Sequence, residues 1–303
     1  MPLLLSIKVD VDTDRGTRIG VPNLVALFDE FGVTATFLFS LGPDNTGRAI
    51  KRIFRPGFLS KVSRTSVIST YGLRTLLNGV LLPGPHVGRR NEDVMRMTRD
   101  KGHEAGVHCY DHIRWQDGLA TMTRDEVFIE FNKARKEFER IFRTPAKTAG
   151  SAGWQANGFS LAAYDEAGLL YASDSRGPHP FYPRSDGVVY KTLQIPTTLP
   201  TLDELLGRPE YPEDHIVEHY LSMLRTDALN VLTIHAEVEG MRQISYFRSF
   251  LEQIRTRSIQ IVKLDNVAGD LLRDSRSLPV CDLIQGTVDG RSGTLAVQSC
   301  KVI

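Results

Sequence analysis

Two pairs of side chains in the sequence have the types and the spacing of metal ligands. Asp10 and Asp12 lie two residues apart, so on a β-strand both carboxylates project from the same face. His108 and His112 lie four residues apart, which would place both imidazoles on one face of a helical turn. Carboxylates and neutral imidazoles are ordinary ligands of zinc and similar cations. The combination predicts a divalent cation held by Asp12, His108 and His112.

Each pair has a structural alternative when it is taken alone. Two aspartates at this spacing more often cap a helix or meet arginines, and surface histidines pair by chance. Their joint presence is what favours the metal site. His103 and Glu104 do not begin the zinc-protease pattern His-Glu-x-x-His, because the next histidine is at 108, one residue too late. We therefore expect a structural role for His103.

A third element is an apolar run, Leu232-Thr233-Ile234, that ends in His235. Alone, such a histidine is usually a hydrogen-bonded structural side chain. Beside a metal site it is suited to act as a general acid near neutral pH. Asp174 is a candidate carboxylate to orient His235, and a helix N-cap is an equally good interpretation of Asp174.

The elements that must position these residues alternate between strand and helix patterns. Apolar and β-branched runs predict strands at 3–11, 34–41, 104–108, 169–172, 231–235 and 259–263. Helical spacing of apolar residues predicts helices at 21–31, 125–142 and 245–255. This alternation is typical of parallel strands with helical crossovers, which carry their chemistry at the C-terminal strand ends. Asp12, His108 and His235 lie at such ends.

Composition is that of a globular α/β chain. The 303 residues, 41% of them hydrophobic, suffice for one large domain or two small ones, and a net charge of +1 gives no global field for a nucleic-acid partner. Three cysteines at wide spacing argue against a disulfide framework and for a reducing compartment. The first residues lack the basic segment of a secretory signal, and no apolar run reaches the roughly 18–20 residues of a membrane span. We expect a cytoplasmic protein.

Two regions fall outside the alternating pattern. The stretch 45–91 holds nine lysines and arginines and no acidic residue, which leaves the rest of the chain with a net charge of −8. Within it, Ile53, Phe54 and Phe58 fall close to one face among cations, as in a helix lying in an anionic membrane interface. The alternative is an ordinary helical insertion packed on the domain. The second region is the C-terminal extension 273–303, where a turn at 288–293 predicts an added hairpin of unassigned role.

Together these motifs resemble the polysaccharide deacetylase (NodB-homology) superfamily. The matching patterns are Asp-x-Asp near the N-terminus, Gly-His-Glu-x-Gly-x-His-x-x-x-His at 102–112 and Leu-x-Ile-His at 232–235. Segments 7–24, 39–48, 195–208 and 233–240 are similar to the bacterial deformylases that act on undecaprenyl phosphate-linked 4-deoxy-4-formamido-L-arabinose. The resemblance, which covers residues 4–270, implies a distorted (β/α) barrel over 1–272. It also implies a metal-dependent hydrolase that releases formate from the lipid-linked sugar during lipid A modification.

The resemblance implies roles for individual residues as well. It makes Asp10 the catalytic base and His235 the acid that protonates the departing amine, and it assigns the cation, zinc, manganese or cobalt, to Asp12, His108 and His112. One departure affects this assignment. A valine separates the two aspartates where the superfamily has adjacent ones, so Asp10 and Asp12 could exchange roles.

A second departure concerns the superfamily's third motif, Arg-x-Pro-aromatic. Here it is replaced by the segment 150–154, Gly-Ser-Ala-Gly-Trp, so we expect Arg176 to take the place of the missing arginine beside Asp10. A backbone N–H near Gly153 is expected to approach the substrate oxyanion. The residues expected to bind substrate are Gly153, Trp154, Arg176 and Glu237.

Other functions fit the same residues. The metal centre specifies amide hydrolysis but not the acyl group, so the chain could remove acetyl groups from a polysaccharide or open a cyclic imide. A catalytically inactive glycolipid-binding module would keep the fold without the chemistry. The favoured deformylase would act at the cytoplasmic face of the inner membrane. Its expected partners are the lipid-linked formamido sugar and the anionic bilayer surface, with no nucleic-acid or protein partner.

Overall fold

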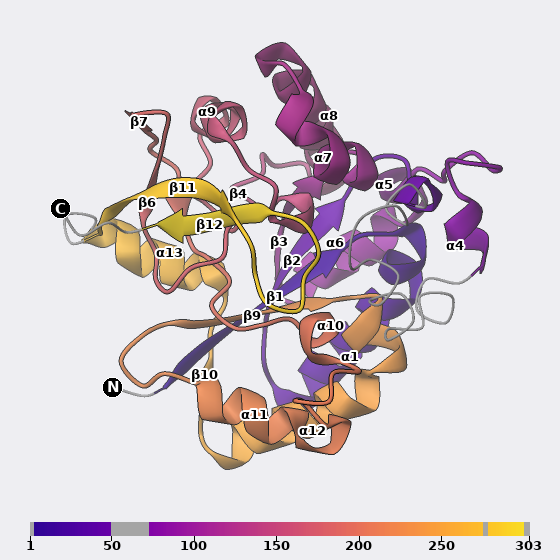
Figure 1. Cartoon of the computed structure of the whole chain (residues 1–303). Coiled ribbons are helices and arrows are strands. Elements are labelled where there is room, and N and C mark those ends of the chain that lie inside the picture. The colour runs from indigo at the N-terminus through magenta and orange to yellow at the C-terminus, as the bar shows by residue number, and fades with distance from the viewer. Residues whose placement is uncertain (1–2, 50–72, 275–277, 300–303) are drawn as a thin grey trace.

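The computed structural model describes residues 3–49, 73–274 and 278–299. Within these ranges eight parallel strands form one curved sheet in the order β10-β1-β2-β3-β4-β5-β8, with β9 also paired to β1 (Figure 1). The strands are β1 (Leu4–Val11), β2 (Thr36–Ser40), β3 (Glu104–Cys109), β4 (Thr148–Ala149), β5 (Tyr171–Ala172), β8 (Leu193–Gln194), β9 (Asn230–His235) and β10 (Gln260–Ile261). The alternating strands and helices of a distorted α/β barrel are confirmed.

Helices connect the strands and cover the outside of the sheet. The longer ones are α1 (Val21–Phe31), α6 (Glu92–Asp100), α8 (Arg124–Phe142), α9 (Gly158–Ala167), α11 (Ile216–Met223), α12 (Ile244–Thr256) and α13 (Leu264–Arg273). The shorter ones are α4 (Leu73–Leu77), α5 (Val87–Arg90), α7 (His112–Gly118) and α10 (Leu202–Leu205). In Figure 1, α1, α11 and α12 pack together on one side of the sheet, and α8 and α9 on another.

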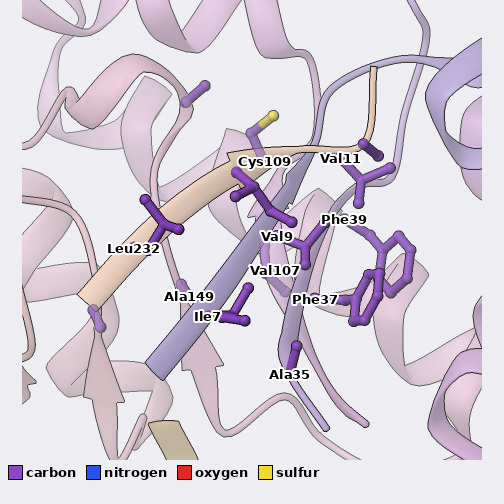
Figure 2. Close-up of a cluster of buried hydrophobic side chains, with 14 of the residues drawn as sticks. Ile7, Val9, Val11, Ala35, Phe37, Phe39, Val107, Cys109, Ala149 and Leu232 are labelled. Carbon is purple, nitrogen blue, oxygen red and sulfur yellow. The ribbon is translucent and has the colours of Figure 1, made fainter. Parts of the chain in front are cut away.

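The core lies between the sheet and these helices. Ile7, Val9 and Val11 of β1 are fully buried there, beside Phe37 and Phe39 of β2 (Figure 2). Each such side chain stabilises the fold by about 1.5–3 kcal/mol relative to its exposure to water. Because side chains alternate along a strand, the register that buries Ile7, Val9 and Val11 in this layer directs the residues between them into the barrel.

The predicted C-terminal hairpin is present and joins a second sheet. β11 (Val280–Gly286) and β12 (Leu295–Ser299) pair antiparallel, and β11 pairs in parallel with β6 (Tyr182–Ser185), which in turn pairs with β7 (Val188–Val189). In Figure 1 this hairpin, in yellow, lies across the barrel, and the loop between its strands reaches toward α10. The extension is therefore packed on the domain.

The prediction that the cysteines form no disulfide is wrong. Cys109 is free and buried in the core, but Cys281 in β11 is disulfide-bonded. An odd number of cysteines still permits one bond, and wide spacing along the chain does not prevent two thiols from meeting in the fold. The cysteines therefore give no support to a reducing compartment.

The proposed membrane segment is only partly covered by the structure. Ile53, Phe54 and Phe58 lie outside the described residues. Among the helices of the described part, none has both the length and the apolar character of a transmembrane span.

Candidate active site

Parallel pairing of β1 with β9 brings Asp10 and His235 to the same edge of the sheet. The two residues are opposite each other in the register of this pair, and Ala236 N donates to Asp10 O at 3.0 Å. Asp12 follows the last residue of β1. The C-terminal edge, where chemistry is expected in such sheets, therefore carries two carboxylates and one imidazole.

The other two imidazoles come from β3 and the turn that follows it. His108 lies in β3, and His112 is the first residue of α7, whose N-cap Asp111 accepts a hydrogen bond from Arg114 N at 3.0 Å. The expectation that one helical turn carries both histidines is wrong. A strand end and a capped helix start bring the two rings together instead, with centroids 5.3 Å apart.

Asp12, His108 and His112 form a cluster suited to a cation. The Nε2 atoms of His108 and His112 lie 3.2 and 3.3 Å from Asp12 Oδ1, and one ligand atom from each residue lies within 4.8 Å of the others. These are the residues that the spacing predicted. A cation about 2.1 Å from each donor fits a cluster of this size.

The hydrogen bonds around the cluster also fit a metal. His108 Nδ1 lies 2.5 Å from the carbonyl oxygen of Gly150, so Nδ1 donates to it and Nε2 is left as a bare acceptor. Across the described residues, His108 Nε2 and Asp12 Oδ1 are buried and lack a hydrogen-bond donor. Acceptors that face each other in a buried site require a positive partner. Two imidazoles and a carboxylate suit a divalent transition metal.

Asp12 is held in its ionised form. Burial acts to raise the pKa of this carboxyl group, but the neighbouring imidazoles of His112 and His108 outweigh burial and lower the pKa well below its ordinary value. An ionised carboxylate is the form that binds a metal.

Asp10 has a cationic neighbour that the sequence analysis missed. Lys8 Nζ lies 3.5 Å from Asp10 Oδ2 and donates to Ser173 O at 3.0 Å. Burial lowers the pKa of Lys8, while the charges of Asp10 and Asp174 act to raise it. Asp10 Oδ1 is buried and has no hydrogen-bond partner among the described residues, and His108 Nδ1 lies 3.9 Å from it. The available signal was the position of Lys8, two residues before Asp10 and hence on the same strand face.

Arg176 does not take the place of the missing arginine. Its Nη1 lies 2.8 and 3.1 Å from the two carboxylate oxygens of Glu204, and its Nη2 donates to Leu199 O at 3.0 Å. The expectation that Arg176 meets Asp10 is wrong, because a buried guanidinium is held by the carboxylate that pairs with it. Lys8 is the cation beside Asp10.

Asp174 supports a backbone loop and does not orient His235. Its carboxylate accepts hydrogen bonds from Ser151 N at 2.6 Å, Gln194 Nε2 at 3.1 Å and Tyr164 Oη at 3.4 Å. Burial raises the pKa of Asp174, against the effect of these donors. Asp174 is not a helix N-cap, since no helix begins directly after it. It does not orient His235 either, because its carboxylate is bound to Ser151 and Gln194 and so holds the segment that leads to Trp154.

Several carboxylates favour the protonated form of His235. Burial acts to lower the pKa of His235, but the charges of Asp12, Asp203 and Asp10 outweigh burial and raise it. Asp203, in α10, was missed because no motif marks it. A raised pKa favours the protonated imidazole, which is the form that a general acid requires.

Glu237 lies beneath the Asp12 loop. Its Oε1 accepts hydrogen bonds from Asp12 N at 3.1 Å and from Thr13 N and Oγ1 at 2.9 and 2.7 Å. Burial and the neighbouring charge of Asp12 raise the pKa of Glu237 to about 8. The sequence predicts a substrate contact for Glu237, whereas its hydrogen bonds hold the backbone of Asp12 and Thr13.

Gly153 and Trp154 form a strained turn at the rim of this edge. Both have positive φ angles, +62° and +54°, and a Cβ at Gly153 would overlap the side chain of Gln116. Trp154 is buried, donates from Nε1 to Thr197 Oγ1 at 3.1 Å, and meets the ring of His235 edge to face at 6.3 Å. The turn therefore places an aromatic wall beside the candidate acid.

Two curated relatives match almost the whole chain, although no family model matches it. The chain is 35% identical over 298 residues to a probable 4-deoxy-4-formamido-L-arabinose-phosphoundecaprenol deformylase ArnD from Shewanella sediminis, covering 98% of this chain and 95% of that protein. It is 30% identical over 290 residues to a protein of the same name from Wigglesworthia glossinidia brevipalpis, covering 95% and 99%.

Solved structures show the same fold. A candidate polysaccharide deacetylase from Mycobacterium smegmatis matches with a TM-score of 0.64, 16% identity and 94% coverage of both chains. A probable polysaccharide deacetylase from Pseudomonas aeruginosa PAO1 has a TM-score of 0.60, 14% identity and coverage of 89% and 91%. A CE4 family pseudoenzyme from Bacillus anthracis has a TM-score of 0.52 and 12% identity, covering 88% of this chain and 66% of that one.

The last of these structures shows that the fold alone does not establish activity. The curated relatives carry the assignment further, because their identity extends over nearly the full length of both chains. The protein is an amide hydrolase with a polysaccharide deacetylase fold, and it belongs to the 4-deoxy-4-formamido-L-arabinose-phosphoundecaprenol deformylase (ArnD) family.

Proposed function

We propose that the chain hydrolyses the N-formyl group of undecaprenyl phosphate-linked 4-deoxy-4-formamido-L-arabinose. The products are formate and the free 4-amino sugar lipid. One observation carries the proposal: a cluster suited to a cation, an Asp10 Oδ1 without a hydrogen-bond partner among the described residues, and His235, opposite Asp10 in the strand register, converge at one strand edge in a chain of this family. These are the groups that amide hydrolysis needs.

Each residue has a defined task in this proposal. A divalent cation at Asp12, His108 and His112 would polarise the formyl oxygen and activate a water molecule. Asp10 accepts the proton of the attacking water at its free Oδ1, while Lys8 balances the charge of the other oxygen. His235 donates a proton to the nitrogen of the sugar as the carbon–nitrogen bond breaks.

The segment 150–154 is the proposed site for the oxyanion. Its backbone is held from below by Asp174, which accepts from Ser151 N, and by His108, which donates to Gly150 O. A backbone N–H near Gly153 would then donate to the developing negative charge without having to reorganise. Trp154 forms the wall against which the sugar lies.

The rival functions have weaker support. Polysaccharide deacetylation rests on likeness to solved structures at 16% identity or less. An inactive glycolipid-binding module would have no need for the Asp10–Lys8 pair or for His235 opposite Asp10 in the strand register. Formyl hydrolysis is favoured because the relatives named for it match nearly the whole chain.

We also propose that the protein binds peripherally to the anionic inner-membrane surface, where its lipid substrate lies. In the described part of the basic stretch, Val80, Leu81 and Leu82 are 53%, 75% and 41% exposed. Arg89 and Arg90 are exposed in the same stretch. Apolar side chains beside cations are the composition of an interfacial anchor. Flotation with anionic vesicles tests this: Leu81→Glu should reduce binding, and unchanged binding would contradict it.

The decisive experiment combines metal analysis with a product assay. The purified protein is measured for bound zinc, manganese and cobalt, and then incubated with the lipid-linked formamido sugar while formate is quantified. We expect about one equivalent of metal and formate release. Acetate release from chitooligomers without formate release would favour the deacetylase, and a metal-free inactive protein would favour the binding module.

A further inference from the structure

The C-terminal hairpin contacts the wall of the candidate active site. Arg176 N donates to Ala296 O at 2.9 Å, so β12 is hydrogen-bonded to the residue whose guanidinium pairs with Glu204. Gln155 Nε2 donates to Thr294 O at 2.7 Å, directly after Trp154 in the chain. The hairpin therefore holds two segments that border the Trp154 ring.

The turn of the hairpin approaches α10 closely. Gly290 has a φ of +76°, and a Cβ at this position would overlap the carbonyl oxygen of Glu204. Asp289 Oδ2 lies 2.8 Å from Arg208 Nη1, which ties the turn to the segment after α10. The approach is visible in Figure 1, where the yellow loop comes down to α10. α10 also carries Asp203, which raises the pKa of His235.

Arg291 lies at the end of this turn and covers Trp154. Its guanidinium carbon is 4.4 Å from the centroid of the Trp154 ring, and its Nη1 is 3.6 Å from Glu204 Oε1. Its side chain is 12% exposed. Arg176 holds Glu204 from closer range, so Arg291 is held between a shared carboxylate and the aromatic face.

Trp154 in turn contacts His235. The two rings meet edge to face, at 75° and a centroid distance of 6.3 Å. Lys8 and Arg176 also lie over the indole, at 5.1 and 5.4 Å from its centroid. Both of these cations belong to the barrel and have carboxylate partners of their own, Asp10 and Glu204. Arg291 differs from these two cations because it comes from the C-terminal extension.

We propose that the C-terminal hairpin completes the active site, and that Arg291 is a positioning residue that holds Trp154 against His235. This inference deepens the proposed deformylase function and rests on it. A catalytic acid acts well only when its ring is held in one orientation, and a displaced wall allows the imidazole to turn away from the leaving nitrogen. Arg291 acts through Trp154 and does not exchange a proton.

The test compares three variants of the full-length protein. Arg291→Ala removes the guanidinium, and Arg291→Lys keeps a cation at the position. Arg184→Ala is the matched control, because it removes an arginine–carboxylate pair, with Asp282, from the four-stranded sheet to which the hairpin belongs. The control pair joins β6 to β11.

Two readouts separate positioning from general stability. The first is formate release, measured as kcat and KM. The second is acrylamide quenching of tryptophan fluorescence, with a Trp115→Phe background to isolate Trp154, since the chain has two tryptophans. We expect Arg291→Ala to lower kcat about tenfold with KM changed less than about twofold, and to increase quenching. Arg291→Lys should recover part of kcat, and Arg184→Ala should match the wild type.

Several outcomes would overturn the proposal. Unchanged kcat and quenching in Arg291→Ala would show that Arg291 does not position Trp154. A raised KM with unchanged kcat would make Arg291 a substrate contact, and equal losses in Arg184→Ala would make the effect one of sheet stability. A wild-type protein that releases no formate would overturn the proposed function instead, while the quenching result would still report whether Arg291 covers Trp154.

Discussion

The two ends of β3 carry titratable residues with opposite surroundings. At its start, Glu104 Oε2 accepts hydrogen bonds from Thr36 Oγ1 and Tyr171 Oη, both at 2.6 Å, and from Asp265 N at 3.2 Å. At its end, His108 Nε2 has no donor within the described part of the chain and lies 3.2 Å from a carboxylate oxygen. Glu104 is half-buried and hydrogen-bonded, whereas His108 is buried and its Nε2 lacks a hydrogen-bond partner within the described ranges. At the carboxyl end, polar atoms without a hydrogen-bond partner in the described structure lie close together, on His108, Asp12 and Asp10.

His103 sharpens the comparison, because it also has an unpaired buried nitrogen. Its Nδ1 accepts from Ala35 N at 3.1 Å, and the rings of Phe28 and Phe37 lie 5.6 and 5.1 Å from its own. Burial lowers the pKa of His103 to about 4, so the ring is neutral and fits its apolar surroundings. A single unpaired atom among aromatic rings is structural. Several such atoms at one strand edge form a candidate site.

The largest expected effect is the loss of metal from the carboxyl end. His108→Ala removes one of three ligands, so bound metal should fall from about one equivalent to near zero and formate release should become undetectable. His103→Ala is the control from the amino end and should keep its metal, although it loses stability. Elemental analysis after dialysis measures the difference. Full metal retention in His108→Ala would show that the cluster is not the metal site.

Asp10→Asn tests the base without removing a ligand. The amide cannot accept the proton of water, so kcat should fall about 10²–10⁴-fold while metal content stays at the wild-type value. Glu104→Gln, an equivalent change at the other end of the sheet, should leave kcat within about twofold. Formate release and elemental analysis on the same samples provide the measurement. If Asp10→Asn lost both its metal and its activity, Asp10 would be the ligand and Asp12 the base.

A third prediction concerns the pH dependence of turnover. Attraction to carboxylates raises the pKa of His235, so the acid keeps its proton to a higher pH than a free imidazole, and kcat should fall as the pH rises through the raised pKa. Asp203→Asn removes one of these charges and should move the alkaline limb to lower pH by about 0.5–1 unit. Profiles of kcat against pH measure the shift. An unmoved limb would exclude Asp203 from the tuning of His235.

The smallest expected effect lies at the amino end and concerns stability. Burial raises the pKa of Glu104 to about 7, so the folded state favours the protonated form. This contribution to stability is present at pH 4.5 and is lost as the pH rises through about 7, up to about 3 kcal/mol in total. Urea unfolding at pH 5 and pH 8 should show a smaller difference for Glu104→Gln than for the wild type. An equal difference would remove Glu104 from the pH dependence.

Much of the site followed from local patterns in the sequence. Strand periodicity decided that Asp10 and Asp12 share a face, and alternation of strands with helices decided that strand ends meet at one edge. These two rules were enough to bring Asp12, His108 and His112 together. The strand at 104–108 was also predicted, but the spacing of four residues did not reveal that His112 begins a separate capped helix, because that spacing fits one helical turn as well.

The partners of the buried charges were decided by the tertiary structure alone. Arg176 pairs with Glu204, Lys8 rather than Arg176 lies beside Asp10, and Asp174 holds Ser151. A charge pairs with whichever group the fold brings within a few ångströms, and that distance bears no relation to separation along the chain. Lys8 reaches a carbonyl 165 residues away, and Asp12 receives support from a carboxylate 225 residues away. The sequence determined which chemistry is possible, and the tertiary structure determined which neighbours tune it.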